Sequence, residues 1–538
     1  MRLRGVLAAI GLLVAFGSPG ALAAPPTLRT SNASRTPTSA KPPEEEVIPI
    51  PPRHATDPAT NLPSAEPEAT DKPLPINLPT ALRLAGGRPV IISAAQASVQ
   101  FAEAELAKAR LEWLPSLNAG VGYYRHDGAT QGQSGNFYIN TKENFLAGAG
   151  LTAKVATADA LFGPLAARQV LRAREFDVQA ARNDALLAAA EAYFNVQQAR
   201  GRLASDQDVI NKGLEFAKAI DFERVTRARP ADLHRARALL ASFEDAVATA
   251  REQWRTASAD LTQVLRLDPT ATVIPLEPPS LRVTLIPPQT SVDALIPVGL
   301  TNRPELASQQ SLVQAALARI RQERMRPLVP SLILQGSPGS AGPGGYLMGG
   351  IFGSGAHGSG DPWLMRDDVS VGLVWEMQNL GLGNRALVRQ REAERQQLLI
   401  DLFRIQDVVA GDIARAHAQL VSATARVTTS ERGVQEAWLA YEEVRKNLDQ
   451  VEHVGTTDVV VHRVFDVIDA LRALSQALDR YFTGATDYNR AQFRLYRALG
   501  YPAGNVVCGS AGAILEVNTA RPLPLPSVCA PDPCPCHR

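Results

Sequence analysis

Two stretches of this sequence, residues 165–223 and 383–450, have the pattern of uninterrupted helix. Helices of about 60 residues are roughly 90 Å long, which exceeds the diameter of a compact domain. In the first stretch apolar positions recur every seven residues, half of them alanine, and predict a closely packed coiled-coil seam. Shorter helices are predicted over 231–266 and 460–499. The seam rows are Leu171, Val178, Ala185, Ala192 and Ala199, with a companion row of Ala189, Val196 and Leu203.

Alternating apolar and small or polar residues precede each long helix and predict strands. The predicted strands are 117–123, 145–155, a weaker one that begins at Leu332, and 368–377. Polar, Gly-rich loops are expected between them, at 125–144 and 336–363. Such strands are long enough to cross a membrane as tilted barrel strands. An ordinary soluble helical bundle is the alternative, and the helix length and the flanking strands argue against it.

The predicted strands have two different faces. One face is small or polar and is expected to line a lumen: Gly120, Gly148, Gly150, Ser370 and Gly372. The other is apolar and is expected to face lipid: Val121, Tyr123, Leu151, Val371 and Leu373. Aromatic residues near the strand ends are candidates for an interfacial girdle: Tyr123, Tyr124, Tyr138 and Trp363. Four strands cannot close a barrel without unpaired edges in lipid, so copies of the chain must pool their strands. Three copies supply twelve strands, which is wide enough for a lumen.

The order of elements occurs twice, which indicates a tandem duplication. The segments 88–117 and 303–332 both begin with Arg-Pro and end with Pro-Ser-Leu at the same spacing. Further along, placing Asp232 on Asp466 aligns the returning helices without gaps. The aligned pairs are Ala236 with Ala470, Trp254 with Tyr488, Ala257 with Ala491, Leu261 with Leu495, and Leu265 with Leu499.

The two ends of the chain differ from this repeated core. Residues 1–23 have a basic start, a short apolar run and a small-x-small site, and predict a secretory signal. Residues 24–79 are Pro-rich and are expected to form an extended linker. The tail, 504–538, holds Cys508, Cys529, Cys534 and Cys536, for which disulfides are favoured over a metal site.

The net charge of the whole chain is +1, which gives no field that would recruit nucleic acid.

Several motifs make residues 78–503 resemble the TolC-like outer-membrane efflux proteins. They are "VGLVWEMQNLGLGNRALV" (371–388), "VGTTDV" (454–459), the returning helix 465–500, and the two segments that end in Pro-Ser-Leu. The resemblance implies a mostly α fold with a membrane β-barrel portion, built from tandem-duplicated antiparallel coiled-coil helices and four strands per protomer. It divides the chain into a first repeat (80–270), a linker (271–290) and a second repeat (291–503).

The same resemblance implies a homotrimer with a 12-stranded barrel in the outer membrane and a helical tunnel in the periplasm. Such a channel serves a tripartite efflux or type I secretion system, as a passive duct, with a periplasmic adaptor and an inner-membrane pump as partners. A periplasmic coiled-coil scaffold or adaptor is the alternative from another class. Nothing in the resemblance implies a cofactor.

The hairpin tips carry the expected contact sites. Val454, Gly455 and Thr456 resemble the family's adaptor-docking motif, although Gly455 alone is also consistent with a simple helix end. The first tip lacks the expected glycine and has Thr226 and Arg227 near that place. About five residues are inserted after Gly455 relative to the family pattern, which makes this tip unusual.

Acidic residues near both tips are candidates for a periplasmic gate. A ring of carboxylates, one set per protomer, would bind cations and narrow a pore. The candidates are Asp221, Glu223, Asp449 and Glu452. A solvated charged face explains the same residues and is the favoured alternative. The eight His are scattered without catalytic or metal-ligand spacing, so we expect neither an enzyme nor a metal site.

Overall fold

The computed structural model of this chain is mostly helical. It describes residues 62, 65–219, 230–336, 350–354, 363–366, 369–447, 451–454, 457–460 and 464–501. The predicted signal, the linker up to residue 61 and the cysteine-containing tail lie outside the described residues.

Two very long helices dominate the fold, as the periodicity predicts. Helix α3 (Thr157–Ala219) has 63 residues and α7 (Leu382–Lys446) has 65. Each packs against the shorter helix that follows it, α4 (Pro230–Leu265) and α8 (Val464–Ala498) respectively. The predicted seam is confirmed along the middle of α3, where the positions from Ala185 to Leu203 are buried; Leu171 and Val178, nearer the sheet, are half-buried.

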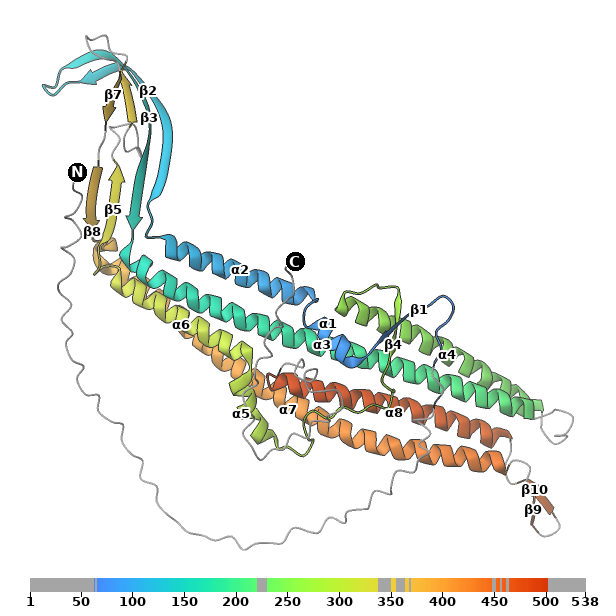
Figure 1. Cartoon of the computed structure of the whole chain (residues 1–538). Helices are drawn as coiled ribbons and strands as arrows, with labels where there is room; N and C mark the ends of the chain where they lie inside the picture. The colour runs from blue at the N-terminus through green and yellow to red at the C-terminus, as the bar shows by residue number, and fades with distance from the viewer. Residues whose placement is uncertain are drawn as a thin grey trace, which may run out of the picture. The chain divides into compact units, whose positions relative to one another are not determined.

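The helices lie side by side in a wall (Figure 1). Next to the sheet the order is α2 (Val90–Leu111), α3, α6 (Pro304–Met325) and α7. Farther from the sheet the order is α4, α3, α8 and α7. Two short helices, α1 (Leu78–Ala85) and α5 (Val292–Asn302), pack against α3 and α7. The long helices α3 and α7 therefore belong to both rows and hold the wall together.

One antiparallel sheet joins the helices at one end. Its strands are β2 (Ser116–Gln131), β3 (Phe137–Val155), β5 (Ser331–Gly336), β6 (Gly350–Ser354), β7 (Trp363–Arg366) and β8 (Val369–Val374). Strand β2 pairs with β3, and β3 is long enough to pair along its other side with both β5 and β6. Strand β8 then pairs with β5, and β7 pairs with β6. The six strands therefore form four rows, which matches the four strands expected per chain.

The first hairpin differs from its prediction. The polar segment 125–144 was expected to be a loop, but β2 and β3 stay paired through it as far as Gln131 and Phe137. Only residues 132–136 form the turn, where the Gly132 N–H donates to the Asn136 carbonyl. Polar side chains do not prevent pairing, because the ladder hydrogen bonds come from the backbone. Of the second predicted loop, 336–363, the structure describes Gly336, β6 and Trp363.

The register places the predicted faces together across the sheet. On the apolar face, Leu117, Val121 and Tyr123 of β2 lie opposite odd-numbered residues of β3. Leu332 and Leu334 of β5 lie opposite Val155 and Ala153, which are odd-numbered residues of β3 as well and therefore share that face. Leu373 and Val371 then pair with Leu332 and Leu334. On the other face, Gly120 pairs with Gly148 and Gly372 with Ile333. The predicted apolar residues of the four rows therefore lie on one face of the sheet, and the predicted small residues lie on the other.

Two small sheets were not predicted. Strand β1 (Lys72–Ile76) pairs in parallel with β4 (Ala271–Pro275), so the end of the Pro-rich segment and the start of the inter-repeat segment are ordered together. Ile76 and the nearby Ala65 are buried in the main core. The second sheet is a hairpin of β9 (Val451–Val454) and β10 (Thr457–Val460), which follows α7.

The inter-repeat segment binds both returning helices at equivalent places. On α4, the Trp254 indole N–H donates to the Val273 carbonyl at 2.9 Å, and Ser258 Oγ accepts from the Val273 N–H at 3.1 Å. On α8, Gln492 accepts from the N–H groups of Leu285 and Ile286 at 3.1 and 2.9 Å. Ser258 and Gln492 occupy the same position in the sequence alignment of the two repeats. The duplication thus extends to how each repeat holds the segment between them.

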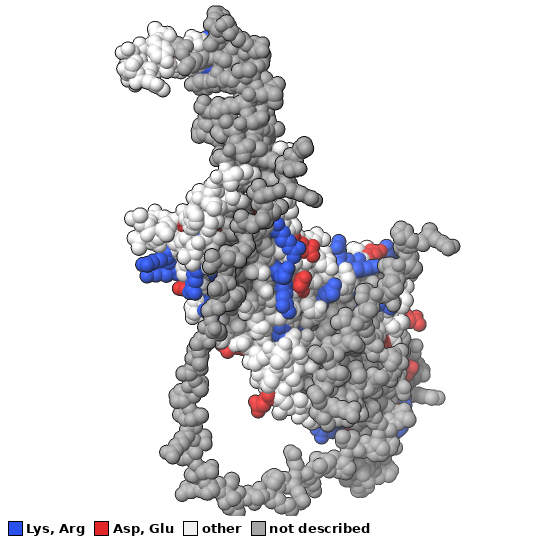
Figure 2. Space-filling view, turned by 60° about the vertical axis from the view of Figure 1, so that its left-hand side comes forward, with Lys and Arg blue, Asp and Glu red and all other residues white. Residues whose placement is uncertain are grey.

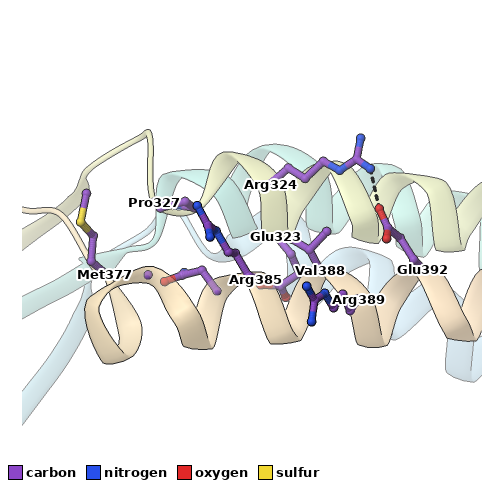
Figure 3. Close-up of a pocket in the computed structure, with 10 residues that line it drawn as sticks. Glu323, Arg324, Pro327, Met377, Arg385, Val388, Arg389 and Glu392 are labelled. Carbon is purple, nitrogen blue, oxygen red and sulfur yellow. Dashed lines mark hydrogen bonds and ion pairs between the residues drawn. The ribbon is translucent and has the colours of Figure 1, made fainter.

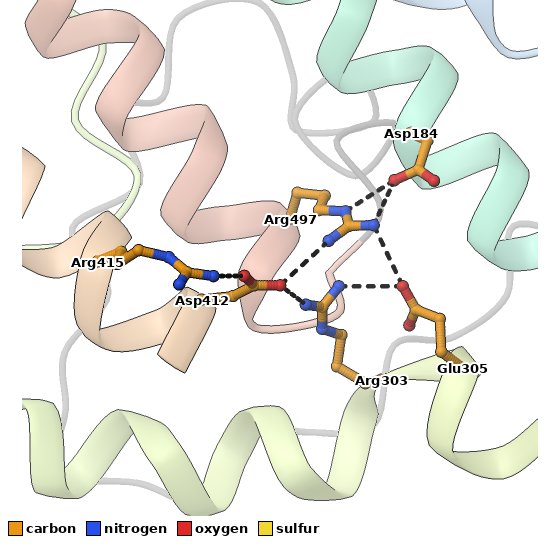
Figure 4. A network of polar contacts seen from close by, with 6 residues as sticks. All are labelled: Asp184, Arg303, Glu305, Asp412, Arg415 and Arg497. Atoms are coloured by element: carbon orange, nitrogen blue, oxygen red, sulfur yellow. Dashed lines mark hydrogen bonds and ion pairs between the residues drawn. The ribbon is translucent and has the colours of Figure 1, made fainter. Parts of the chain in front are cut away.

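A charged network joins the first half to the second (Figure 4). Arg497 of α8 contacts Asp184 of α3 at 2.6 Å and Glu305 of α6 at 3.2 Å. Arg303, at the start of α6, contacts Glu305 at 3.0 Å and Asp412 of α7 at 2.7 Å. Four helices of the wall are therefore linked by one set of ion pairs.

Candidate functional site

The wall has two free edges, and each edge continues from helix to strand. Helix α2 packs against α3 and leads directly into β2, which is an outer strand that pairs with β3. At the opposite edge β8 pairs with β5 and leads through the short helix η1 (Gln378–Gly381) into α7. Among the described residues, β2 and β8 each have one unpaired side next to their helix. One edge is therefore α2–β2 and the other is β8–α7.

Both edges expose large apolar side chains. On α7, Phe403, Val421 and Leu439 recur at intervals of five full turns, so they share one exposed face, which differs from the buried face that contains Val409 and Leu420. Val90, Phe101 and Leu111 form a similar exposed row on α2. Exposed apolar rows on helices are typical of surfaces that pack against another protein.

The apolar face of the sheet is exposed as well. Leu117, Val121, Tyr123, Val371 and Leu373 are each more than half exposed, although they form one continuous apolar face. An apolar sheet face with nothing packed on it is costly in water. Tyr138, another aromatic residue at the strand ends, is also exposed.

The junction between sheet and helices has a strained turn and a pocket. Asn379, Leu380 and Gly381 have φ values of 51°, 58° and 85°, which for a leucine is an uncommon backbone conformation. Beside the turn, the end of α6 and the start of α7 line an open pocket of about 450 Å³ (Figure 3). It is lined by Glu323, Arg324, Pro327, Met377, Gly381, Asn384, Arg385, Val388, Arg389 and Glu392.

Charged side chains elsewhere are spread over the helices. On the face shown in Figure 2, basic and acidic side chains of the described residues lie close together over the helical part. One buried group stands out on α3. Burial raises the pKa of Asp206 to about 6, an effect that the Arg202 charge opposes and the nearby Asp479 increases. Arg202 lies 4.0 Å from Asp206 and 3.3 Å from Asp479.

The structure describes little of the predicted tip sites. Asp221, Glu223, Thr226, Arg227, Asp449, Gly455 and Thr456 lie outside the described residues. Glu452 and Val454 lie on β9, opposite Val459 and Thr457 of β10. Residues inserted after Gly455 thus form part of an additional hairpin that sequence reasoning missed. The run Val459-Val460-Val461 was the signal, because β-branched residues favour strands.

Membrane-spanning helices and metal-ligand clusters do not occur among the described residues. None of the helices in the described ranges is both long enough and apolar enough to cross a membrane. Within those same ranges, no group of three or more His, Cys, Asp or Glu side chains could hold a metal ion.

Solved structures share this arrangement of wall and sheet. The open-state outer-membrane channel MtrE of Neisseria gonorrhoeae is 18% identical and aligns over 82% of this chain and 94% of its own, with a TM-score of 0.62. The fold is that of the TolC-like outer-membrane channels. The outer-membrane channel CmeC of Campylobacter jejuni aligns over 79% of this chain and 85% of its own, at 16% identity and a TM-score of 0.62. A membrane protein from Pseudomonas aeruginosa aligns over 83% of this chain and 100% of its own, at 19% identity and a TM-score of 0.63.

These similarities lie in structure rather than in sequence. No protein-family model and no curated protein matches the sequence. The TolC-like fold confirms the resemblance drawn from the motifs, and it covers both repeats and the sheet. The exposed apolar features of this fold are the sheet face and the two edges.

Proposed function

We propose that this chain is the outer-membrane channel component of a tripartite efflux or type I secretion system. In this proposal three copies form a passive duct, with a 12-stranded barrel in the outer membrane and a helical tunnel in the periplasm. The partners are a periplasmic adaptor, an inner-membrane pump and outer-membrane lipid. The chain performs no chemistry on its cargo and takes no cofactor.

The two continuous edges carry the proposal. A sheet of four rows leaves unpaired backbone groups on β2 and β8, which cannot remain unpaired in lipid. The helix next to each of these strands exposes apolar side chains on the same edge. Head-to-tail contact of the α2–β2 edge with the β8–α7 edge of the next copy would cover both at once. A contact of this heterologous kind generates a closed ring when the rotation between successive copies closes.

The sheet face supports the membrane location. Its apolar residues are exposed in the single chain, and lipid is the environment in which that exposure is favourable. Gly120, Gly148 and Gly372 share the opposite face, which would line the lumen. A soluble scaffold has no need of an exposed apolar sheet face opposite a face of small residues.

The tip sites stay part of the proposal. Val454, Gly455 and Thr456, with Thr226 and Arg227 of the first tip, are proposed to contact the adaptor. Asp221, Glu223, Asp449 and Glu452 are proposed to narrow the pore. Because Glu452 lies on the β9–β10 hairpin, we propose that this hairpin takes part in the adaptor contact.

Assembly and conductance test the proposal. The full chain, expressed with its signal and purified from outer-membrane fractions in detergent, is expected to have the mass of a trimer by light scattering. In planar bilayers it is expected to conduct ions. Recovery in the soluble periplasmic fraction, or a stable monomer in detergent, would contradict the proposal and favour a scaffold.

A further inference from the structure

The pocket at the junction of sheet and helices contains an unbalanced positive charge. Both acidic groups that line it lie within ion-pair distance of an arginine: Glu392 is 2.6 Å from Arg324, and Glu323 is 3.1 Å from Arg326, although the buried Glu323 Oε2 has no hydrogen-bond partner among the described residues. Arg385 and Arg389 also line the pocket, from the first turns of α7. Among the described residues, neither has an acidic partner or a hydrogen bond. Two guanidinium groups therefore remain available to an anion.

A buried donor lines the same pocket. Asn384 is only 5% exposed, and its side-chain oxygen accepts from the Gln378 N–H at 2.8 Å. That hydrogen bond fixes the orientation of the amide, and it leaves Asn384 Nδ2 without a partner in the part of the chain that the structure describes. An unpaired buried donor is costly, and a bound acceptor would remove the cost. The donor and the two arginines call for the same kind of ligand, a negatively charged oxygen acceptor.

The rim of the pocket is apolar and extends outward. Leu380 is 96% exposed and has a left-handed backbone conformation, which is unfavourable for a leucine. Trp375 and Met377, which follow the apolar face of β8, are also exposed. Figure 3 shows Met377 at one end of the pocket and the Arg324–Glu392 pair at the other. A ligand that suits both parts has an anionic head and an apolar body.

We propose that this pocket binds the phosphate of an anionic phospholipid, with its acyl chains along Leu380 and the apolar face of the sheet. The inference rests on the proposed function, because the junction meets lipid only if the sheet lies in a membrane. Arginine suits phosphate because its planar guanidinium donates two parallel hydrogen bonds. A cavity of this size is in the range that holds a headgroup. The lipid leaflet is thereby anchored where barrel and tunnel join.

Lipid selectivity of the full-length protein tests the inference. The detergent-solubilised trimer is incubated with phosphatidylglycerol and phosphatidylcholine in equal amounts, and bound lipids are counted by native mass spectrometry. R385Q/R389Q removes both unpaired charges. R319Q/R321Q is the matched control, because Arg319 and Arg321 are exposed on the neighbouring α6 but do not line the pocket. We expect the wild type to prefer phosphatidylglycerol, and R385Q/R389Q to reduce that preference about tenfold. The control should keep it.

Other occupants of the pocket give different results. An equal loss in both double variants would show that surface charge alone attracts the lipid, and would overturn the inference. Displacement of the lipid by excess glycerol phosphate would indicate a soluble anion as the ligand. If R385Q/R389Q kept the lipid preference but no longer had the mass of a trimer, the two arginines would bind a second copy of the chain. Each of these two results also overturns the inference.

A parallel measurement separates this inference from the proposed function. The wild type is tested for trimer mass and bilayer conductance in the same preparation. A conducting trimer without preference for phosphatidylglycerol would remove the lipid site and leave the channel. A protein that neither assembles nor conducts would overturn the channel and the lipid site together.

Discussion

Arg303 donates to the carboxylate of Asp412 at 2.7 Å although only 3% of its side chain is exposed. Arg303 directly precedes α6 and Asp412 lies in the middle of α7, so the pair connects two neighbouring helices of the wall. Arg497 brings α3 and α8 into the same network through Asp184 and Glu305. A buried charge is tolerated only when it is well paired, so removing one partner leaves the other uncompensated.

We therefore expect R303M to lower the free energy of unfolding by about 3 kcal/mol, since Asp412 and Glu305 would lose a buried partner. Thermal unfolding of the detergent-solubilised protein, followed by circular dichroism, measures the change. R415M is the matched control, because Arg415 contacts the same Asp412 at 2.6 Å from a side chain that is 70% exposed. Exposed pairs contribute about 0–1 kcal/mol, so equal shifts in both variants would refute the assignment.

Asp206 predicts a pH dependence. Its pKa is raised to about 6 by burial, so between about pH 4 and pH 6 the folded protein keeps a proton that the unfolded chain releases. The wild type should therefore lose stability as pH rises through this window. D206N removes the penalty and should be more stable than wild type by about 3 kcal/mol at pH 7, with no difference near pH 4. Melting temperatures across this pH range measure it.

The control for this prediction is D245N, because Asp245 is exposed on α4 and has no resolved partner among the described residues. Its melting temperature should differ from wild type by the same amount at every pH. A D206N curve parallel to that of the wild type would contradict the assignment of the pH dependence to Asp206.

The α7 edge predicts a specific assembly defect. F403E places a charge at a side chain that is 60% exposed in the single chain but would be buried between copies. An unpaired charge in an interface is costly, so the trimer should dissociate to monomer in detergent. Light scattering measures the mass. L165E is the control, since Leu165 is 49% exposed on α3 in the middle of the wall. A trimer in both variants would exclude this edge as the contact.

A charged residue is expected to have a different effect on each face of β8. V371R places a charge on the proposed lipid face and should destabilise the membrane-inserted protein by roughly 1–3 kcal/mol. G372R, one residue away, points to the proposed lumen, where a Cβ would meet no atom within 4 Å. It should leave insertion intact and reduce conductance. Outer-membrane yield and single-channel conductance distinguish the two, and a loss of yield confined to G372R would reverse the assignment of faces.

Local patterns predicted much of this architecture. The seven-residue apolar repeat on α3 and the alternation on β2 and β8 depend only on residues that are close together in the sequence. They therefore predict the long helix, the strands and the two faces of the sheet directly. The polar composition of 125–144 predicts a loop, whereas backbone pairing continues through this segment to Gln131 because it needs no apolar side chains. The tip was read from motifs, and its β9–β10 hairpin was missed.

The sequence by itself determined the long helices, the alternating strand segments and the phase of the two sheet faces. Each of these follows from the period of side chains along one segment. Only the tertiary structure decided which helices form the edges, that Arg303 meets Asp412, and that Arg385, Arg389 and Asn384 line one pocket. Those relationships join residues far apart in the chain, and the period within each segment does not specify which segments become neighbours.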